Sequence, residues 1–215
     1  GQVDAIHTVL GFSAFVLVLN KRPILSVAAF VLALNMKTQA IIFGPPLFLM
    51  LLPYYLKSYK TLLYTLGVMV FIQLIILFPY IMHSKLDKVY EVVVGSVDHY
   101  PVVSMNAFNF WHLLLDGNLM ETSDKLKFLG ISYFAWGLIL FMGLSLVTML
   151  PLMKRLWINW KNATFMGDSL NDWRLVFLIV GIIGVLFFYF PTQMHERYVH
   201  PAIIFLGAFA ILSRD

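Results

Sequence analysis

Residues 61–82 read TLLYTLGVMVFIQLIILFPYIM and contain no charged side chain. A helix needs about 20 predominantly apolar residues to cross about 30 Å of hydrocarbon, and this stretch meets that requirement. Residues 130–152 and 173–190 are apolar over a similar length. These three stretches therefore predict membrane-spanning helices.

The composition of the whole chain supports the same class of protein. Of its 215 residues, 60% are hydrophobic and 12% are charged, which is more apolar than one water-soluble domain of this size needs. We expect an all-α integral membrane protein with a single transmembrane domain over residues 1–215. The absence of cysteine excludes disulfides and thiolate metal sites. An apolar run follows closely after Gly1, which is no initiator Met, so we expect a C-terminal piece of a longer protein.

Four shorter apolar runs also predict spans, provided that one end of each is recessed below the membrane surface. They are residues 5–20, 23–36, 39–56 and 198–212. Together with the three longer stretches they predict a bundle of about seven transmembrane helices.

The basic residues divide unevenly between the two sides that seven alternating spans define. One side has nine: Lys21, Arg22, Lys57, Lys60, Lys154, Arg155, Lys161, Arg174 and Arg214. The other has six: Lys37, Lys85, Lys88, Lys125, Lys127 and Arg197. The positive-inside rule places the first set in the cytoplasm, so the second set faces outside.

The predicted outer side holds one long extracytoplasmic connection, residues 83–129. Long connections without clear secondary structure are more often functional than merely connective. Within it, residues 103–115 are aromatic and apolar, and Asn106 and Asn109 are three residues apart. This pattern predicts a short helix lying in the membrane interface.

Two candidate motifs lie near the beginning of the chain, on the outer side. Gly1-Gln2-Val3-Asp4 precedes an apolar run, and the residues alone favour a helix N-terminus in which Asp4 complements the macrodipole. Lys37-Thr38-Gln39 follows a run of only 14 residues, about 21 Å of helix, so Lys37 should be recessed. Lys37 could line a cavity and hold a phosphate, or it could snorkel to the interface, and both readings stay open. We expect Gly44-Pro45-Pro46 to break the next helix and open a cavity.

The third candidate motif is Asn106-Ala107-Phe108-Asn109-Phe110-Trp111. Aromatic side chains collect at the level of the lipid headgroups, and an anchor of this kind explains the rings. The two amides could bind sugar hydroxyls or a phosphate. The residues alone favour the anchor.

The fourth motif is the densest: Met194-His195-Glu196-Arg197-Tyr198-Val199-His200-Pro201. It is not a zinc site of the HExxH type, because its histidines are five residues apart rather than four and Pro201 follows at once. Glu196 and Arg197 could form a simple loop ion pair. The density of ionisable groups favours function, with Arg197 suited to a phosphate and His195 to acid–base chemistry.

Two functions fit this distribution of polar residues. One is a membrane transferase that uses a lipid-linked substrate at the outer leaflet, and the alternative is a transporter or flippase for a lipid or polysaccharide precursor. Transporters usually carry polar sites near the midplane and show repeated halves. Here Gln73 is the main polar residue at mid-depth of the long spans, and no repeat is present. The pattern favours the transferase.

The four motifs, in this order and at these gaps, resemble the polytopic GT-C class of glycosyltransferases. They are most similar to the bacterial mannosyltransferase-like proteins related to the second mannosyltransferase of glycosylphosphatidylinositol assembly. The resemblance extends over essentially the whole chain, and residues 194–201 are its most specific part. The endoplasmic-reticulum glucosyltransferases that use dolichyl-phosphate glucose look like more distant relatives.

This resemblance implies inverting transfer of a hexose from a polyprenyl-phosphate sugar to a glycan or lipid acceptor. The hexose expected from the resemblance is mannose. It also implies a multi-pass protein of the cell membrane with an active site facing outside. The membrane expected from the resemblance is the bacterial inner membrane. Lys37 and Arg197 would bind the donor phosphate. The substrate-binding residues would be Gln2, Asp4, Gln39, Asn106, Asn109, Trp111, His195, Glu196 and Tyr198.

The resemblance implies no metal, no cofactor and no nucleic-acid partner. Members of the GT-C class carry a catalytic Asp in the first outer loop, a region that we expect to lie before Gly1. The catalytic residue of this chain is therefore left unassigned. Asp4 is the nearest substitute, and we expect it to orient substrate or support the structure rather than act as the base.

Overall fold

The computed structural model describes residues 4–95 and 101–214, and most of them are helical. The helices are α1 (Asp4–Leu19), α2 (Pro23–Met36), the 3-10 helix η1 (Thr38–Phe43), α3 (Gly44–Lys57), α4 (Tyr59–Met82), α5 (Leu86–Gly95), α6 (Trp111–Leu114), α7 (Tyr133–Lys161), α8 (Leu170–Tyr189), the 3-10 helix η2 (Glu196–Val199) and α9 (His200–Leu212). The strands have two residues each: β1 (Ser104–Met105), β2 (Lys127–Phe128), β3 (Ile131–Ser132) and β4 (Met194–His195).

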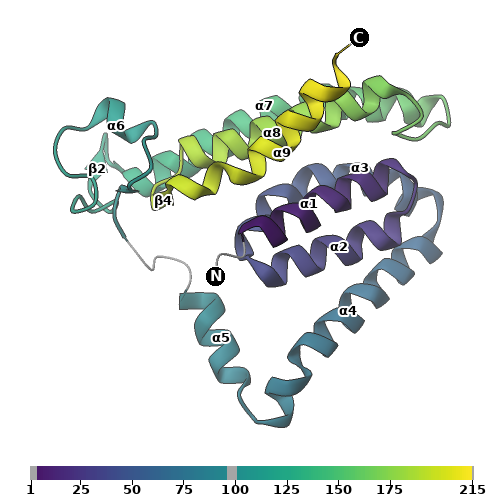
Figure 1. Cartoon of the computed structure of the whole chain (residues 1–215), viewed down its shortest axis with the longest axis horizontal. Coiled ribbons are helices and arrows are strands. Elements are labelled where there is room, and N and C mark those ends of the chain that lie inside the picture. The colour runs from purple at the N-terminus through teal and green to yellow at the C-terminus, as the bar shows by residue number, and fades with distance from the viewer. Residues whose placement is uncertain (1–3, 96–100, 215) are drawn as a thin grey trace.

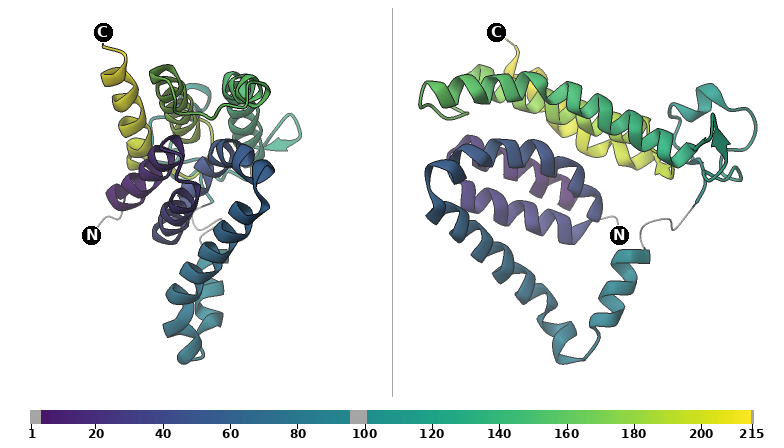
Figure 2. Two further views of the ribbon diagram at one scale, coloured as in Figure 1. Left: turned by 90° about the vertical axis from the view of Figure 1, so that its right-hand side faces the viewer. Right: turned by 180° about the vertical axis from the view of Figure 1, so that it is seen from behind.

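The long helices form two layers. Helices α7, α8 and α9 run side by side in one layer, and α1, α2 and α3 form the other (Figure 1). Helices α4 and α5 extend away from both layers as a V (Figures 1 and 2). Almost all of α4 is exposed, with Thr65 its one residue described as buried. A long apolar helix with most of its surface exposed is typical of a membrane-spanning helix.

Four helical segments are long and apolar enough to cross a membrane among the described residues: Thr38–Lys57, Tyr59–Met82, Tyr133–Lys161 and Leu170–Tyr189. The chain is therefore a helical protein of membrane type. The run expected over residues 39–56 gains length because η1 continues directly into α3. The break expected at Gly44-Pro45-Pro46 is this change from 3-10 to α geometry, since the prolines occupy the first turn of α3.

Helix α7 is longer than the apolar stretch that predicted it. It ends at Lys161 rather than at residue 152, and its 29 residues span about 43 Å. Its extra turns carry Trp157, Trp160 and Lys161, residue types that favour the membrane interface. The apolar stretch covers only part of the helix, so composition underestimates its length.

Aromatic rings join the two layers. Phe205 of α9 lies 5.4 Å, centroid to centroid, from both Phe15 of α1 and Phe43 of η1, and all three side chains are buried. Phe12 of α1 stacks on Phe177 of α8 at 5.1 Å. Each such pair contributes about 0.5–1.5 kcal/mol beyond its buried area. These contacts hold the beginning of α9 against α1 and η1, where the polar motifs lie.

The connection between α7 and α8 packs on the end of α1. Gly167 has φ +103°, and a Cβ there would lie 2.0 Å from the carbonyl oxygen of Leu19. Next to it, Asp168 forms an ion pair with Lys21, which follows α1. Only glycine fits this position, both for its φ and for the close approach of the two backbones.

The single helix expected over residues 103–115 is wrong. The structure has strand β1, then irregular backbone, and only the four residues of α6 are helical. Strand β1 pairs in parallel with β4, Ser104 opposite Met194 and Met105 opposite His195. The local pattern suited a helix, but pairing with a distant segment satisfies the same backbone groups and overrides it.

Candidate functional site

Polar side chains from the start of α1 and from two connections between helices gather at one end of the two layers. We call this group the Asp4 cluster: Asp4, Lys37, Gln39, His195, Arg197 and Tyr198. Asp4 begins α1, Lys37 and Gln39 lie where α2 passes into η1, and the other three lie between α8 and α9. The neighbouring ends of α1, α2 and α9 make this convergence possible (Figure 1).

The carboxylate of Asp4 lies at the centre of the cluster. Its Oδ1 accepts a hydrogen bond from Lys37 Nζ, and its Oδ2 lies 3.8 Å from Arg197 Nε. The side chain is 8% exposed. The sequence reading of a helix N-terminus is correct, because Asp4 is in the first turn of α1. The structure adds that the same carboxylate faces the two cations selected as phosphate ligands.

Lys37 is held by two partners. Its backbone is extended, with φ −159°, where α2 ends. Its ammonium therefore points to Asp4 and also lies over the ring of Tyr198, 4.2 Å from the centroid. Desolvation strengthens such a cation–π contact. The lysine side chain is 20% exposed, so it lies inside the protein and does not snorkel along the helix surface.

Two buried polar atoms in the cluster have no hydrogen-bond partner among the described residues. They are Gln39 Oε1 and Arg197 Nε. The amide nitrogen of Gln39 does reach the carbonyl of Tyr198, at 3.4 Å. A buried donor or acceptor without a partner costs about 1–3 kcal/mol, so such atoms often mark the place of a water or a ligand.

His195 completes the cluster on the α9 side. Its ring meets that of Tyr198 edge to face, with centroids 5.3 Å apart. Burial and the nearby positive charge of Arg197 lower the pKa of His195 below its ordinary value of 6.5. The lowered pKa favours the neutral form of the imidazole.

The long connection reaches the cluster through backbone pairing. Asn106 follows β1, forms a bridge with His195 and has φ 60°, a conformation that asparagine tolerates better than most residues. Its side chain is exposed beside the cluster. Of the predicted Asn pair, only Asn106 is available for an external ligand, because Asn109 is buried.

Asn109 and Trp111 use their polar groups inside the protein. Asn109 Oδ1 accepts from the backbone N–H of Trp111 at 3.3 Å, and its Nδ2 donates to the carbonyl of Pro191 at 3.5 Å. Trp111 Nε1 donates to the carbonyl of Phe190 at 2.8 Å. Both residues thus attach the loop to the end of α8 and position the fourth motif.

One residue that sequence reasoning did not select also ties the loop to that motif. Asp124 is fully buried, and its Oδ2 accepts from Thr192 Oγ1 at 2.9 Å and from Gln193 Nε2 at 2.8 Å. Nothing in the local sequence signals this, because Ser123-Asp124-Lys125 is typical of a solvated loop. Its burial depends on partners nearly 70 residues away.

The two remaining predicted site residues are not part of the Asp4 cluster. Glu196 is exposed, and Gln2 lies outside the described residues. Within residues 4–95 and 101–214, no three His, Asp or Glu side chains gather as a metal site requires. The cluster thus combines two cations, one carboxylate and neutral polar groups. Its chemistry suits an anion with hydroxyl groups beside it.

Comparison with protein families, with curated proteins and with solved structures finds no match to this chain.

Proposed function

We propose that the chain is part of a membrane glycosyltransferase of the GT-C kind, which transfers a hexose from a polyprenyl-phosphate sugar to an acceptor outside the cytoplasm. The observation that carries the proposal is the convergence of Lys37 and Arg197 on one point, now occupied by the Asp4 carboxylate. Two cations against one carboxylate leave an excess positive charge. A phosphate is the anion that a membrane-embedded transferase of this kind must bind.

The proposal includes seven crossings, by η1 with α3 and by α1, α2, α4, α7, α8 and α9. The four segments of sufficient length support four of them. Helices α1, α2 and α9 have 16, 14 and 13 residues and meet the others at the Asp4 cluster. Short helices recess their ends, and recessed ends would hold the cluster below the outer surface of the membrane.

In this scheme the acceptor hydroxyl attacks the anomeric carbon from the face opposite the lipid phosphate, and the bond from that carbon to the phosphate oxygen breaks. The hydroxyl proton passes to the general base that the GT-C resemblance implies. Negative charge then develops on the leaving phosphate. Lys37 and Arg197 stabilise that charge, and they do so most strongly in the transition state. Asp4 holds both cations in position when no phosphate is bound.

The other members of the cluster orient the sugar. Gln39 and Asn106 offer amide groups to hydroxyls, and Tyr198 offers a ring face next to Lys37. Asn109, Trp111 and Asp124 act as positioning residues, since their polar atoms bind the protein itself.

The test is lipid-donor kinetics of the full-length protein in liposomes. Arg197→Gln and Lys37→Gln should lower kcat/KM for the polyprenyl-phosphate sugar at least tenfold each, because each removes one charged contact to the phosphate. Lys85→Gln, an exposed lysine beyond α4, is the matched control and should have no effect. Unchanged kinetics in both cluster variants would refute the phosphate assignment, and transport of the labelled lipid without product would favour the flippase.

Sidedness is tested by cysteine labelling in this chain without native cysteine. Lys60 and Lys85 are exposed and lie at opposite ends of α4. Lys85→Cys should react with an impermeant reagent added outside, and Lys60→Cys should react only after the membrane is opened. The reverse pattern would place the Asp4 cluster in the cytoplasm.

A further inference from the structure

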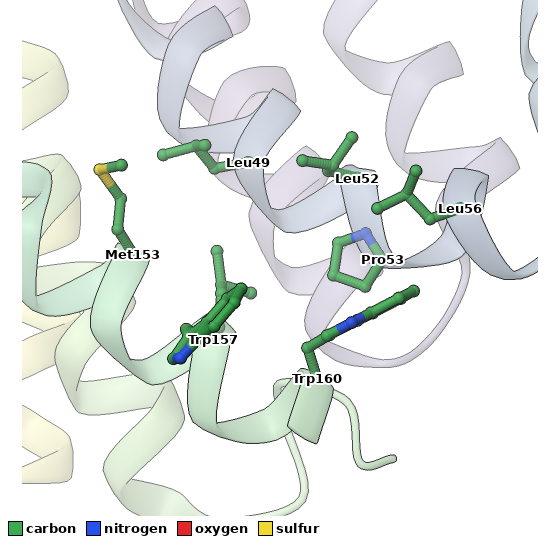
Figure 3. A pocket seen from close by; sticks show the side chains of 8 residues that line it. Leu49, Leu52, Pro53, Leu56, Met153, Trp157 and Trp160 are labelled. Atoms are coloured by element: carbon green, nitrogen blue, oxygen red, sulfur yellow. The ribbon is translucent and has the colours of Figure 1, made fainter. Parts of the chain in front are cut away.

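A second site lies at the opposite end of the molecule from the Asp4 cluster, where α3 ends and α7 approaches its end. The two helices leave a pocket of about 240 Å³ between them. Its walls are apolar: Leu49, Leu52 and Leu56 on α3, and Met153, Trp157 and Trp160 on α7. Figure 3 shows the α3 side chains facing those of α7 across this space, with the Trp160 ring next to Pro53 and Leu56.

The pocket continues towards the end of α3 into a second hollow of about 230 Å³. Pro53 and Trp160 line both, so the two form one groove, which we call the α3–α7 groove. The second hollow is lined also by Lys57, Thr164 and Phe165. The groove is therefore apolar along its length and polar at one mouth, with the polarity of a lipid that has its headgroup at that mouth.

The charge at the mouth is positive and uncompensated. Lys57 Nζ lies 4.8 Å from the centroid of the Phe165 ring and has no carboxylate partner among the described residues. Lys161, on the same side of the bundle, lies over Trp157 at 5.1 Å and likewise pairs with no described carboxylate. None of the described residues lining the groove is acidic. By contrast, nearby Lys21 and Arg155 pair with Asp168 and Asp172.

The tryptophans mark the depth of the groove in the membrane. Trp157 and Trp160 are 61% and 46% exposed, and neither indole N–H has an acceptor among the described residues. Half-exposed indoles with a free donor favour the headgroup level of a bilayer, where phosphate and ester oxygens accept hydrogen bonds. Lys57 and Lys161 also lie on the side that the positive-inside rule assigns to the cytoplasm.

We propose that the α3–α7 groove binds one anionic phospholipid of the cytoplasmic leaflet. An acyl chain occupies the apolar part between Leu49, Leu52 and Met153. The phosphate lies at the mouth, against the ammonium of Lys57 and beside Trp160 and Thr164, which line the same hollow. Basic pockets between membrane helices on the cytoplasmic side are suited to anionic headgroups. This site is independent of the proposed transferase activity, because it shares no residue with the Asp4 cluster.

The experiment measures quenching of tryptophan fluorescence in bilayers of phosphatidylcholine. Brominated phosphatidylglycerol at a few mole per cent should quench more strongly than brominated phosphatidylcholine at the same fraction, because the groove concentrates the anionic lipid. The double variant Trp157→Phe with Trp160→Phe should lose this excess quenching. Equal quenching by the two lipids in the wild-type protein would overturn the proposal.

A matched pair of charge variants assigns the headgroup contact. Lys57→Gln should weaken the preference for phosphatidylglycerol about fivefold, the factor expected for one basic residue near an anionic lipid. Lys60→Gln removes an equal charge at the same end of the bundle but outside the groove, and it should retain the preference. Lys57→Arg should retain it too, which separates lost binding from lost folding. Equal losses in the two glutamine variants would refute a defined lipid site. Loss of the excess quenching on addition of inorganic phosphate alone would also refute it, because the groove would then bind free phosphate rather than a lipid.

Discussion

Asp4→Asn separates the structural role of the Asp4 carboxylate from the anion-binding role of its two partners. The substitution keeps the size of the side chain, and it keeps the bond from Thr8 Oγ1 to the Asp4 carbonyl, at 2.6 Å. It removes the negative charge that faces Lys37 and Arg197. Two cations then face each other in a partly buried site.

The size of the effect follows from burial. Exposed ion pairs contribute about 0.2–1 kcal/mol, whereas removing one partner of a fully buried pair costs about 3–5 kcal/mol. The Asp4 side chain is 8% exposed and that of Lys37 is 20% exposed, so the pair lies between these limits and nearer to the buried one. We expect Asp4→Asn to lower the free energy of unfolding by about 2 kcal/mol.

The same substitution should strengthen anion binding. Without the internal carboxylate, the phosphate of a polyprenyl phosphate meets both cations directly, and its affinity should rise severalfold. The free energy of unfolding is measured in mixed micelles of nonionic detergent and dodecyl sulfate, and affinity by titration of the short-chain lipid phosphate. Lys37→Gln provides the second arm of a double-mutant cycle with Asp4→Asn.

Two results would refute this reasoning separately. A stability loss below about 0.5 kcal/mol, or strict additivity with Lys37→Gln, would show that the ion pair contributes little. A stability loss without any gain in lipid-phosphate affinity would leave the ion pair intact as a structural contact and remove the phosphate from the site.

Three further predictions concern other parts of the fold. Gly167→Ala should destabilise the protein far more than Gly117→Ala in thermal unfolding, because both have positive φ but only the former would place a Cβ against a backbone carbonyl of α1. Trp111→Phe should cost about 1 kcal/mol and increase proteolysis of the long connection, since it removes the indole donor but keeps an aromatic ring. The NMR titration midpoint of His195 should lie below 6.5 and rise in Arg197→Gln. The unfolded histidine binds a proton at higher pH than the folded one, so the contribution of His195 to stability should fall as pH drops below about 6.5. An NMR midpoint at or above 6.5 would contradict the burial of the ring.

The class of the protein and its longest helices could be read directly from the chain. An apolar stretch such as 61–82 carries its own backbone hydrogen bonds as a helix, so its structure depends on no distant partner. The beginning of α1 at Asp4 and the change of helix type at Gly44 could also be predicted from the sequence. Both depend on residues in the first turn of a helix: an acidic residue in α1 and prolines in α3. Local composition suffices where local interactions decide the structure.

The arrangement of the site depends on contacts between residues far apart in the sequence. Asp4 and Lys37 are 33 residues apart, and Arg197 joins them only because α9 packs against α1. Pairing of β1 with β4 replaced the helix expected over residues 103–115, and it separated exposed Asn106 from buried Asn109. Charge pairs, buried atoms without a hydrogen-bond partner such as Gln39 Oε1, and buried groups such as Asp124 are defined by their neighbours. Those neighbours are set by the packing of the helices, so they cannot be predicted from composition and spacing alone.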